Sequence, residues 1–350
     1  MHIDLKGRKI GIGYPVFFIA EAGVNHNGSI YLAKELVDIA VNAGADAVKF
    51  QTFKTENIIT PDAPKSTYHI QTTGSDDKQT WFDLLKTQEL TERMHIELIK
   101  YCSEKNILFL STPYDNSSAD LLEKLGVPAF KIASTDTNNI PFLQYVARKH
   151  RPMILSSAMS NMKEVIEAVN AIRSEGLQEI AMLQCTGNYP TRLEDSNLNV
   201  IGTFSKQLNC IIGYSDHTLE LINPIAATAM GASIFEKHFT IDKSLPGPDH
   251  RMALNPVELK NTILAIRQTE KAMGNSRKEV LESEKENRSK LRKSLVAGVD
   301  INEGTVIEKE MIAIKRPGIG LPPSYLSKLI GKKATCNISQ NSILAEAMFK

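Results

Sequence analysis

The chain has 350 residues, and its 41 lysine and arginine residues nearly balance its 40 aspartate and glutamate residues, giving a formal net charge of +1. This balance argues against a nucleic-acid-binding surface as the main function, because such a surface needs a basic excess to displace counterions. The cysteines form no CxxC pair, which argues against a disulfide framework or a thiolate zinc site. No apolar stretch approaches about 18 residues, and the N-terminus lacks the apolar region of a signal peptide. We therefore expect a soluble cytoplasmic protein.

One unit recurs from Phe17 to about Gly274: a short apolar run, a polar turn and an amphipathic helical stretch. The apolar runs show little polar alternation, which is typical of strands buried on both faces of a parallel sheet. The predicted strands are 17–22, 47–52, 107–112, 129–134, 152–157, 180–186, 210–216 and 233–239.

The stretches between these strands have apolar residues at i, i+3 and i+4, as expected for helices packed on one face. Examples are 31–44, 118–126, 162–176 and 257–274, which end at Gly44, Gly126, Gly176 and Gly274, where a left-handed residue would terminate each helix. Eight such repeats over roughly 250 residues predict an α/β fold, a (β/α)8 TIM barrel. No GxGxxG fingerprint opens the first turn, which weighs against a dinucleotide-binding fold.

Two segments depart from this repeat. Residues 53–90 form a long polar insertion after the second strand, and an insertion of this length predicts a functional lid.

The barrel is expected to span 1–276, followed by a charged, solvated linker over 277–292. The remaining module, 293–350, is rich in Gly, Pro and β-branched residues and has one plausible short helix, so we expect it to work by docking.

The catalytic residues of such a barrel lie at the C-terminal ends of its strands. Because barrel interiors are normally packed with apolar side chains, polar residues at these ends indicate an active site. The polar residues found there are Glu21, Asn25, His26, Lys49, Gln51, Thr112, Lys131, Ser134, Ser156, Tyr189, Ser215, Asp216, His217, Glu236, Lys237 and His238.

His217 and His238 end the seventh and eighth strands, so their rings could face one cavity. Two imidazoles from neighbouring strands suit a divalent metal ion with open water positions. The alternative is that each is a half-buried histidine that hydrogen-bonds within the protein.

Lys49 and Lys131 end the second and fourth strands. A buried ammonium is costly unless it is paired, so these lysines indicate an anionic ligand, with nearby Ser and Thr hydroxyls as further donors. Two alternatives stay open: pairing with Glu21 or Asp216, or a Schiff-base lysine. Asp249 and Arg316 lie in Pro-Gly turns. Instead of belonging to the site, Asp249 could be a capping residue and Arg316 an ordinary surface arginine.

Several motifs together carry a resemblance to a known family. They are IAEAGVNHNG (19–28), VKFQTF (48–53), STPYD (111–115), FKIAS (130–134), YPT (189–191), GYSDHT (213–218), FEKHFT (235–240), GPDH (247–250) and KRPG (315–318). Over nearly the whole chain, this order resembles the sialic acid synthase family, whose members make N-acetylneuraminate, legionaminate or pseudaminate. The resemblance implies a C-terminal antifreeze-like (SAF, β-clip) domain after the barrel.

The resemblance also implies an activity and roles for individual residues. Members condense phosphoenolpyruvate with an N-acyl hexosamine and work as domain-swapped homodimers. Carried over by motif, His217 and His238 would bind Mn²⁺ or Mg²⁺, with Glu21 as the acid/base beside them. The residues implied to hold phosphoenolpyruvate are Lys49, Thr112, Lys131, Ser134, Ser156 and Ser215, and those implied to contact the sugar are Gln51, Asp136, Tyr189, Asp249 and, from the partner's antifreeze-like domain, Arg316.

The sequence leaves the identity of the acceptor sugar undecided. Ser134, Thr135 and Asp136 replace a Ser-Gly-Glu run common in the family, and CTGN (185–188) is also variable. An N-acetylmannosamine-type sugar is the main expectation, with the 2,4-diacetamido-2,4,6-trideoxymannose of legionaminate synthesis as the alternative and a pseudaminate precursor further away. A 6-phosphorylated sugar would call for added cations in 53–90, where Lys54, Lys65 and Lys78 stand.

Two other classes of function compete with this one. A metal-dependent aldolase would use free pyruvate and release no phosphate. A non-catalytic module, with an antifreeze-like unit that binds ice or carbohydrate, would leave the polar strand ends without a purpose.

Overall fold

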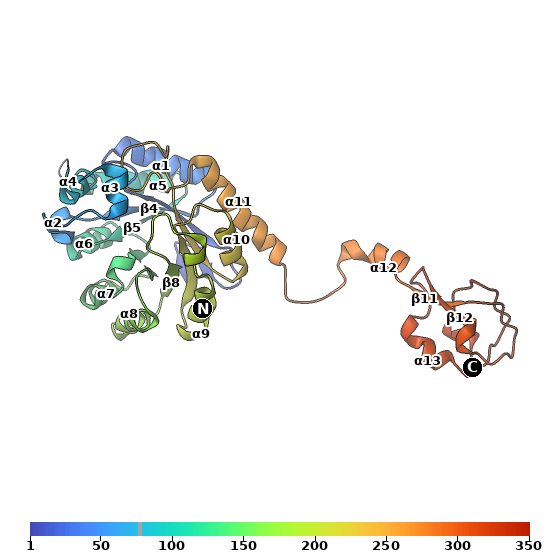
Figure 1. Ribbon diagram of the computed structural model, residues 1–350. Helices are drawn as coiled ribbons and strands as arrows, with labels where there is room; N and C mark the ends of the chain where they lie inside the picture. Colours follow the sequence, from blue (N-terminus) through green and yellow to red (C-terminus); the bar gives the residue numbers. More distant parts are fainter. Residues whose placement is uncertain (76–78) are drawn as a thin grey trace. The chain divides into compact units, whose positions relative to one another are not determined.

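The computed structural model describes residues 1–75 and 79–350, which form two compact units, Met1–Gly274 and Asn275–Lys350. In the first unit, eight parallel strands curve into a nearly closed barrel surrounded by helices (Figure 1). The eight predicted strands are confirmed. They are β3 (Phe17–Gly23), β4 (Ala47–Thr52), β5 (Leu108–Pro113), β6 (Phe130–Ile132), β7 (Met153–Ser156), β8 (Ile180–Cys185), β9 (Ile211–Asp216) and β10 (Ile234–His238).

The strand order is β5-β4-β3-β10-β9-β8-β7-β6, and every described pairing in this sheet is parallel. The register places Glu21 beside Lys49 on β4 and beside His238 on β10. It also places Glu236 beside Ser215 on β9. Because parallel strands end at the same edge, these polar side chains gather at the carboxyl end of the barrel.

The outer layer consists of α1 (Ile30–Ala43), α5 (Glu92–Glu104), α6 (Asn116–Lys124), α7 (Ile140–Ala147), α8 (Met162–Ser174), α9 (Asn199–Gln207), α10 (Ile222–Ala229) and α11 (Pro256–Met273). Local sequence explains where these helices begin and end. Asn161 caps α8 in a capping box with Glu164. Gly44 ends α1 in the left-handed conformation (φ 87°, ψ 28°), as predicted. Gly274 has φ 55° but ψ −134°, so that prediction is wrong there, because the residue combines a positive φ with a ψ outside the left-handed helical region.

A hairpin closes the amino end of the barrel, and it was not predicted from the sequence because it precedes the repeating unit that begins at Phe17. β1 (His2–Leu5) pairs antiparallel with β2 (Arg8–Gly11). Ile3, Leu5 and Ile10 are buried against the inward apolar side chains of the barrel strands. This apolar plug leaves the carboxyl end as the open end of the barrel.

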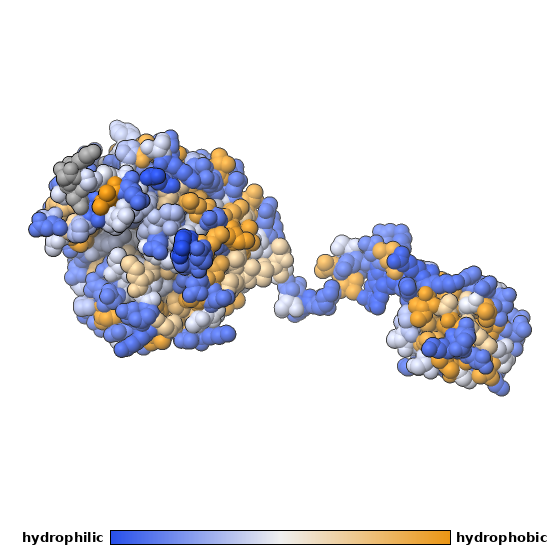
Figure 2. Space-filling view, in the orientation of Figure 1, coloured by the Kyte–Doolittle hydropathy of each residue, from blue (hydrophilic) through white to orange (hydrophobic). Residues whose placement is uncertain are grey.

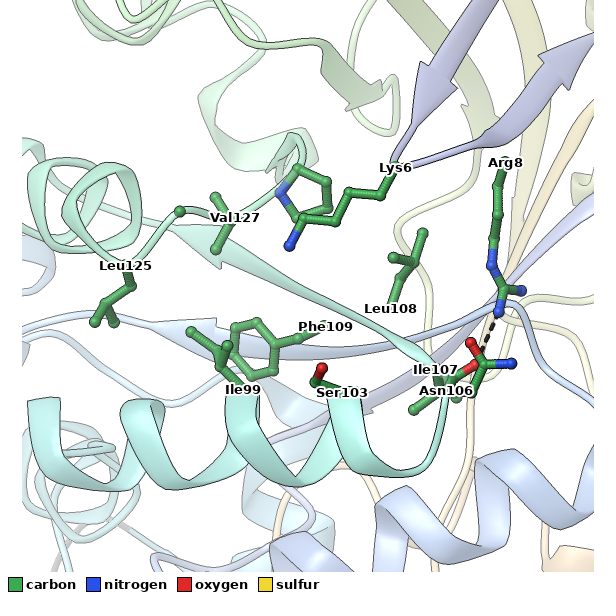
Figure 3. Close-up of a pocket in the computed structure, with 12 residues that line it drawn as sticks. Lys6, Arg8, Ile99, Ser103, Asn106, Ile107, Leu108, Phe109, Leu125 and Val127 are labelled. Carbon is green, nitrogen blue, oxygen red and sulfur yellow. Dashed lines mark hydrogen bonds between the residues drawn. The ribbon is translucent and has the colours of Figure 1, made fainter.

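A smaller cavity of about 290 Å³ lies at the plugged end, beneath the hairpin side chains Lys6 and Arg8 and between α5 and the start of β5 (Figure 3). Arg8 is held there by Asp46 and by the carbonyl of Asn106. None of the predicted site residues lines this cavity.

The insertion 53–90 folds into the short helices α2 (Thr55–Ile58), α3 (Thr67–Thr73) and α4 (Trp81–Thr87), with residues 76–78 lying outside the described chain. Phe53 and Leu85 are buried together with Val24, and Ile58, Ile59, Trp81 and Tyr114 pack around them. The insertion therefore packs around a small apolar core that it shares with Val24 and Tyr114 of the barrel.

The second unit has its own apolar core. β11 (Ser294–Ala297) pairs antiparallel with β12 (Ile312–Lys315), and the predicted short helix contains α13 (Leu326–Leu329). Its buried residues are Leu295, Ala297, Ile301, Ile307, Leu329, Ala334, Ile338, Leu344 and Phe349. The charged segment before it holds a helix that was not predicted, α12 (Lys285–Leu291), with no buried residue. No helix in the described part of the chain is long and apolar enough to cross a membrane.

Candidate active site

A cavity of about 600 Å³ opens at the carboxyl end of the barrel strands. It brings together twelve of the fourteen residues predicted for the site. They are Glu21, Lys49, Gln51, Thr112, Lys131, Ser134, Ser156, Tyr189, Ser215, His217, His238 and Asp249.

Two lysines and two glutamates form a buried charge cluster at the base of this cavity. Lys49 Nζ lies 2.6 Å from Glu21 Oε2 and 3.7 Å from Glu236 Oε2, and Lys131 Nζ lies 3.6 Å from Glu236 Oε1. None of the four side chains is more than 7% exposed. Glu236 thus bridges the lysines, although it was recognised from the sequence only as a polar strand end. Its position two residues before His238, on the same face of β10, was the available signal.

The alternative that the lysines pair with carboxylates of the protein, Glu21 or Asp216, is confirmed in part. Lys49 does pair with Glu21, but Asp216 pairs instead with Lys237, at 2.5 Å. The hydroxyl groups also face the lysines: Lys49 Nζ donates to Thr112 Oγ1 at 3.1 Å, and Lys131 Nζ donates to Ser156 Oγ at 2.7 Å. Ammonium and hydroxyl donors therefore converge on one region, as an anion requires.

Burial and mutual charge shift the pKa values of this cluster. Burial and the neighbouring Glu236 raise the pKa of Glu21 to about 7, against the opposing effect of Lys49. Burial alone would raise the pKa of Glu236, but Lys131 and Lys49 together hold it below its ordinary value. Burial lowers the pKa of Lys131. Glu21 is therefore the member of the cluster that exchanges a proton most readily near neutral pH.

The two predicted histidines lie side by side, with ring centroids 5.6 Å apart. His217 Nδ1 lies 2.7 Å from the carbonyl of Thr186 and donates a hydrogen bond to it. His238 Nδ1 is buried without a hydrogen-bond partner, 3.8 Å from Asp249 Oδ2. Burial and His217 lower the pKa of His238 well below its ordinary value, which favours the neutral ring that binds metals.

These two imidazoles fit a divalent cation, because both line the cavity and His238 Nδ1 is a buried nitrogen without a hydrogen-bond partner. Within residues 1–75 and 79–350, no group of three or more His, Cys, Asp or Glu side chains is placed to hold a metal ion. A cation here would therefore take two ligands from the protein, leaving positions for water and substrate.

Comparison with known proteins bears on the whole chain. The NeuB family model matches residues 36–278, and the SAF domain model matches residues 292–350. The chain belongs to the NeuB family.

Relatives of this NeuB-family chain include the N,N'-diacetyllegionaminic acid synthase of Campylobacter jejuni, 42% identical over 94% of this chain and 98% of that protein. The N-acetylneuraminate-9-phosphate synthase of Homo sapiens is 36% identical over 98% of this chain and 95% of that protein. Among solved structures, the N-acetylneuraminic acid synthetase of Leptospira borgpetersenii has a TM-score of 0.72 at 33% identity, covering 82% of this chain and 95% of that one. The chain is thus an enzyme of the sialic acid synthase kind.

Two predicted residues of this NeuB-family chain do not line the described cavity. Asp136 is buried, and its carboxylate accepts hydrogen bonds from Asn139 and Thr135. This arrangement ties it to the start of α7. Arg316 belongs to the second unit, so its role stays a prediction.

Other cavity residues were not predicted from the sequence. Cys185 ends β8, one of the strand ends that was searched, and its Sγ lies 3.8 Å from His217 Nδ1. The insertion contributes Tyr68, whose ring centroid lies 6.0 Å from that of Tyr189. His69 and Trp81 are stacked with centroids 4.1 Å apart. No strand periodicity marks the insertion residues, since their positions depend on how the short helices pack.

Proposed function

We propose that this protein condenses phosphoenolpyruvate with the open-chain form of an N-acyl hexosamine of the N-acetylmannosamine type, giving a nonulosonic (sialic) acid and inorganic phosphate. The observation that carries the proposal is the placement of Lys49 and Lys131 at the base of the cavity that His217 and His238 also line. Such a cavity can hold an anion and a cation next to each other. The names of the relatives, synthases of three different sialic acids, support the same chemistry.

The charge cluster is proposed to hold phosphoenolpyruvate. Its phosphate and carboxylate need several donors in a partly dry site, and Lys49 and Lys131 supply fixed positive charge. The hydroxyls of Thr112, Ser134, Ser156 and Ser215 line the same region. Because the lysines already face Glu21 and Glu236, binding of the substrate exchanges part of these ion pairs for new ones.

The metal ion is proposed to be Mn²⁺ or Mg²⁺ held by His217 and His238. When bound, it would act as a Lewis acid that polarises the aldehyde of the open-chain sugar. Asp249 lies beside His238, and burial raises the pKa of this carboxyl to about 6. Gln51 and Tyr189 line the cavity beside these groups and are proposed to orient the sugar.

The reaction balances as follows. Carbon 3 of phosphoenolpyruvate forms a bond to the aldehyde carbon, whose oxygen takes a proton from the protonated Glu21 and becomes a hydroxyl, and positive charge develops on carbon 2. Water adds at carbon 2 and gives up a proton, for which Glu21 is the proposed acceptor. The bond between carbon 2 and the bridging oxygen then breaks, phosphate leaves with the electron pair of that bond and the proton of the carbon 2 hydroxyl, and the ketone of the product remains. Lys49 and Lys131 hold the phosphate and carboxylate throughout.

We also propose a homodimer in which Arg316 of one protomer reaches the site of the other. Apolar side chains gather over α10 and α11 on the barrel surface (Figure 2). Leu219, Leu221 and Ile222 are 51%, 42% and 54% exposed. An exposed apolar patch of this kind is typical of a subunit interface.

The test is incubation with phosphoenolpyruvate and N-acetylmannosamine or 2,4-diacetamido-2,4,6-trideoxymannose, followed by mass spectrometry and a phosphate assay. The proposal predicts one phosphate for each nonulosonic acid formed. Product formed from pyruvate, without phosphate, would instead support an aldolase.

A further inference from the structure

Two polar residues at strand ends have no role in the proposed reaction: Asp216 on β9 and Lys237 on β10. Neither of them lines the cavity. The residues directly before and after each of them do line it: Ser215, His217, Glu236 and His238. Because side chains alternate between the two faces of a strand, Asp216 and Lys237 point to the outer face of the barrel wall.

Asp216 and Lys237 form an ion pair that joins β9 to β10 behind the two histidines. The two residues are partners in the strand register. Lys237 Nζ lies 2.5 Å from Asp216 Oδ2, and neither side chain is more than 3% exposed. A buried ion pair loses so much hydration that apolar residues of similar size often stabilise a fold equally well. Stability alone therefore gives little reason for this pair.

The pair also holds the backbone directly after His217. Lys237 Nζ donates to the carbonyl of Thr218 at 2.6 Å. The second carboxylate oxygen of Asp216, Oδ1, accepts from the Thr218 N–H at 3.0 Å and from the Thr218 hydroxyl at 2.9 Å. Asp216 and Thr218 are the residues on either side of His217, so the chain is held on both sides of this histidine.

The same contacts link His217 to the strand that carries the second histidine. Lys237 directly precedes His238 on β10. The contacts that His217 makes itself, from Nδ1 to the carbonyl of Thr186 and from its own carbonyl to the N–H of Thr191, lead to the segment after β8. The ion pair is therefore a side-chain link between the positions of the two histidines.

We infer that Asp216 and Lys237 are positioning residues for the metal ion, because their ion pair holds His217 and His238 in the relative position that one divalent cation requires. The inference rests on the proposed metal site. A site with two protein ligands tolerates little displacement of either ring. Replacing residues that orient metal ligands typically weakens metal binding by about 10- to 100-fold.

Geometry and charge predict opposite results for Lys237→Met. This variant removes a positive charge near the proposed cation and leaves the carboxylate of Asp216, so charge alone would strengthen Mn²⁺ binding. The positioning role predicts weaker binding, because the carboxylate and the Thr218 carbonyl lose their common partner. Lys237→Met therefore separates the two effects.

The experiment titrates Mn²⁺ into the full chain without substrates and follows free Mn²⁺ by electron paramagnetic resonance. We expect Lys237→Met to raise the Kd for Mn²⁺ by about 10- to 100-fold. The double variant Asp216→Asn, Lys237→Met should show a rise in the same range. It buries no unpaired charge and keeps an acceptor for Thr218, so it is expected to fold, which thermal unfolding checks.

Lys149→Met is the matched control. Lys149 is also largely buried, with a side chain 9% exposed, and it pairs with Asp120 and Glu123 of α6. Losing this ion pair should lower the thermal stability without changing the Kd for Mn²⁺, because the pair has no contact with β9 or β10. A general effect of lost ion pairs on folding is thereby separated from an effect on the metal site.

The titrations distinguish failure of this inference from failure of the proposed metal site. An unchanged Kd in the well-folded double variant, or stronger Mn²⁺ binding by Lys237→Met, would overturn the inference and leave the metal site in place. An unmodified enzyme that binds no Mn²⁺ would overturn the metal site, and the inference with it.

Discussion

The ammonium group of Lys131 lies 3.6 Å from the carboxylate of Glu236, which also faces Lys49 at 3.7 Å. One carboxylate therefore holds two buried cations together at the base of the barrel mouth. Removing either lysine leaves the charges unbalanced, and removing the carboxylate leaves two like charges facing each other. Under the proposed function, the role of this cluster is to bind the anionic substrate and not to stabilise the fold.

Lys131→Met should therefore act on phosphoenolpyruvate and not on the sugar. We expect the KM for phosphoenolpyruvate to rise on the order of 100-fold, because a desolvated charge partner is lost, while the KM for the sugar changes by less than about 3-fold. Steady-state kinetics with each substrate varied in turn measures both. Lys100→Met, at a 78% exposed position, is the control. An equal rise in both constants would count against the assignment.

His238→Ala tests the metal site. The variant should lose stimulation by added Mn²⁺ and should no longer bind Mn²⁺ in a titration followed by electron paramagnetic resonance, because only one protein ligand remains. His150→Ala, at an exposed position, should behave as the unmodified enzyme. Full Mn²⁺ binding by His238→Ala would reject this residue as a ligand.

The proposed exchange of Arg316 between protomers can be tested by mixing two inactive variants. Arg316→Ala and Lys49→Ala protomers, refolded together, should regain about a quarter of the normal activity, because half of the dimers are mixed and each mixed dimer has one intact site of two. Sites built within a single chain would give no recovery on mixing.

The apolar patch itself is tested by Ile222→Asp, which places a charge in it, and gel filtration of this variant should show monomers.

Two buried histidines outside the charge cluster should make the fold acid-sensitive. Burial lowers the pKa of His26 and of His250 to about 4 from an ordinary 6.5. The unfolded chain then takes up these protons at a higher pH than the folded chain does, so the free energy of unfolding falls as pH drops from 6.5 towards 4. His26 should account for about 3 kcal/mol of that loss at pH 4, and His250, which solvent screens more, should account for less.

Urea denaturation at several pH values measures this loss. In the unmodified protein the Gly28 N–H donates to His26 Nδ1, with 3.0 Å between the two nitrogens. His26→Asn keeps an acceptor for this N–H but has no group that titrates here, so the variant should lose less stability on acidification than the unmodified protein does. His2→Gln, at an exposed position, should leave the dependence unchanged. A flat stability between pH 6.5 and 4 would contradict the prediction.

The parts of the site carried by strands could be predicted from the sequence, and those carried by the insertion could not. Lys49, Lys131 and His238 lie on strands whose buried apolar runs fix both the barrel and the face on which each residue points. Trp81 and Gln88 are placed by the packing of short helices, which leaves no regular pattern. Asp136 lies in the turn Ser134–Asp136 after β6, and its carboxylate accepts a hydrogen bond from Asn139 beside α7, so its contact with the sugar stays a prediction.

The fate of the bridging oxygen of phosphoenolpyruvate tests the central claim most directly. Phosphoenolpyruvate labelled with ¹⁸O at that oxygen is incubated with the acceptor sugar, and both products are analysed by mass spectrometry. The account predicts that the released phosphate carries the label, because the bond between carbon 2 and that oxygen breaks after water has added. Label retained in the sugar acid, or product formed without phosphate, would contradict it.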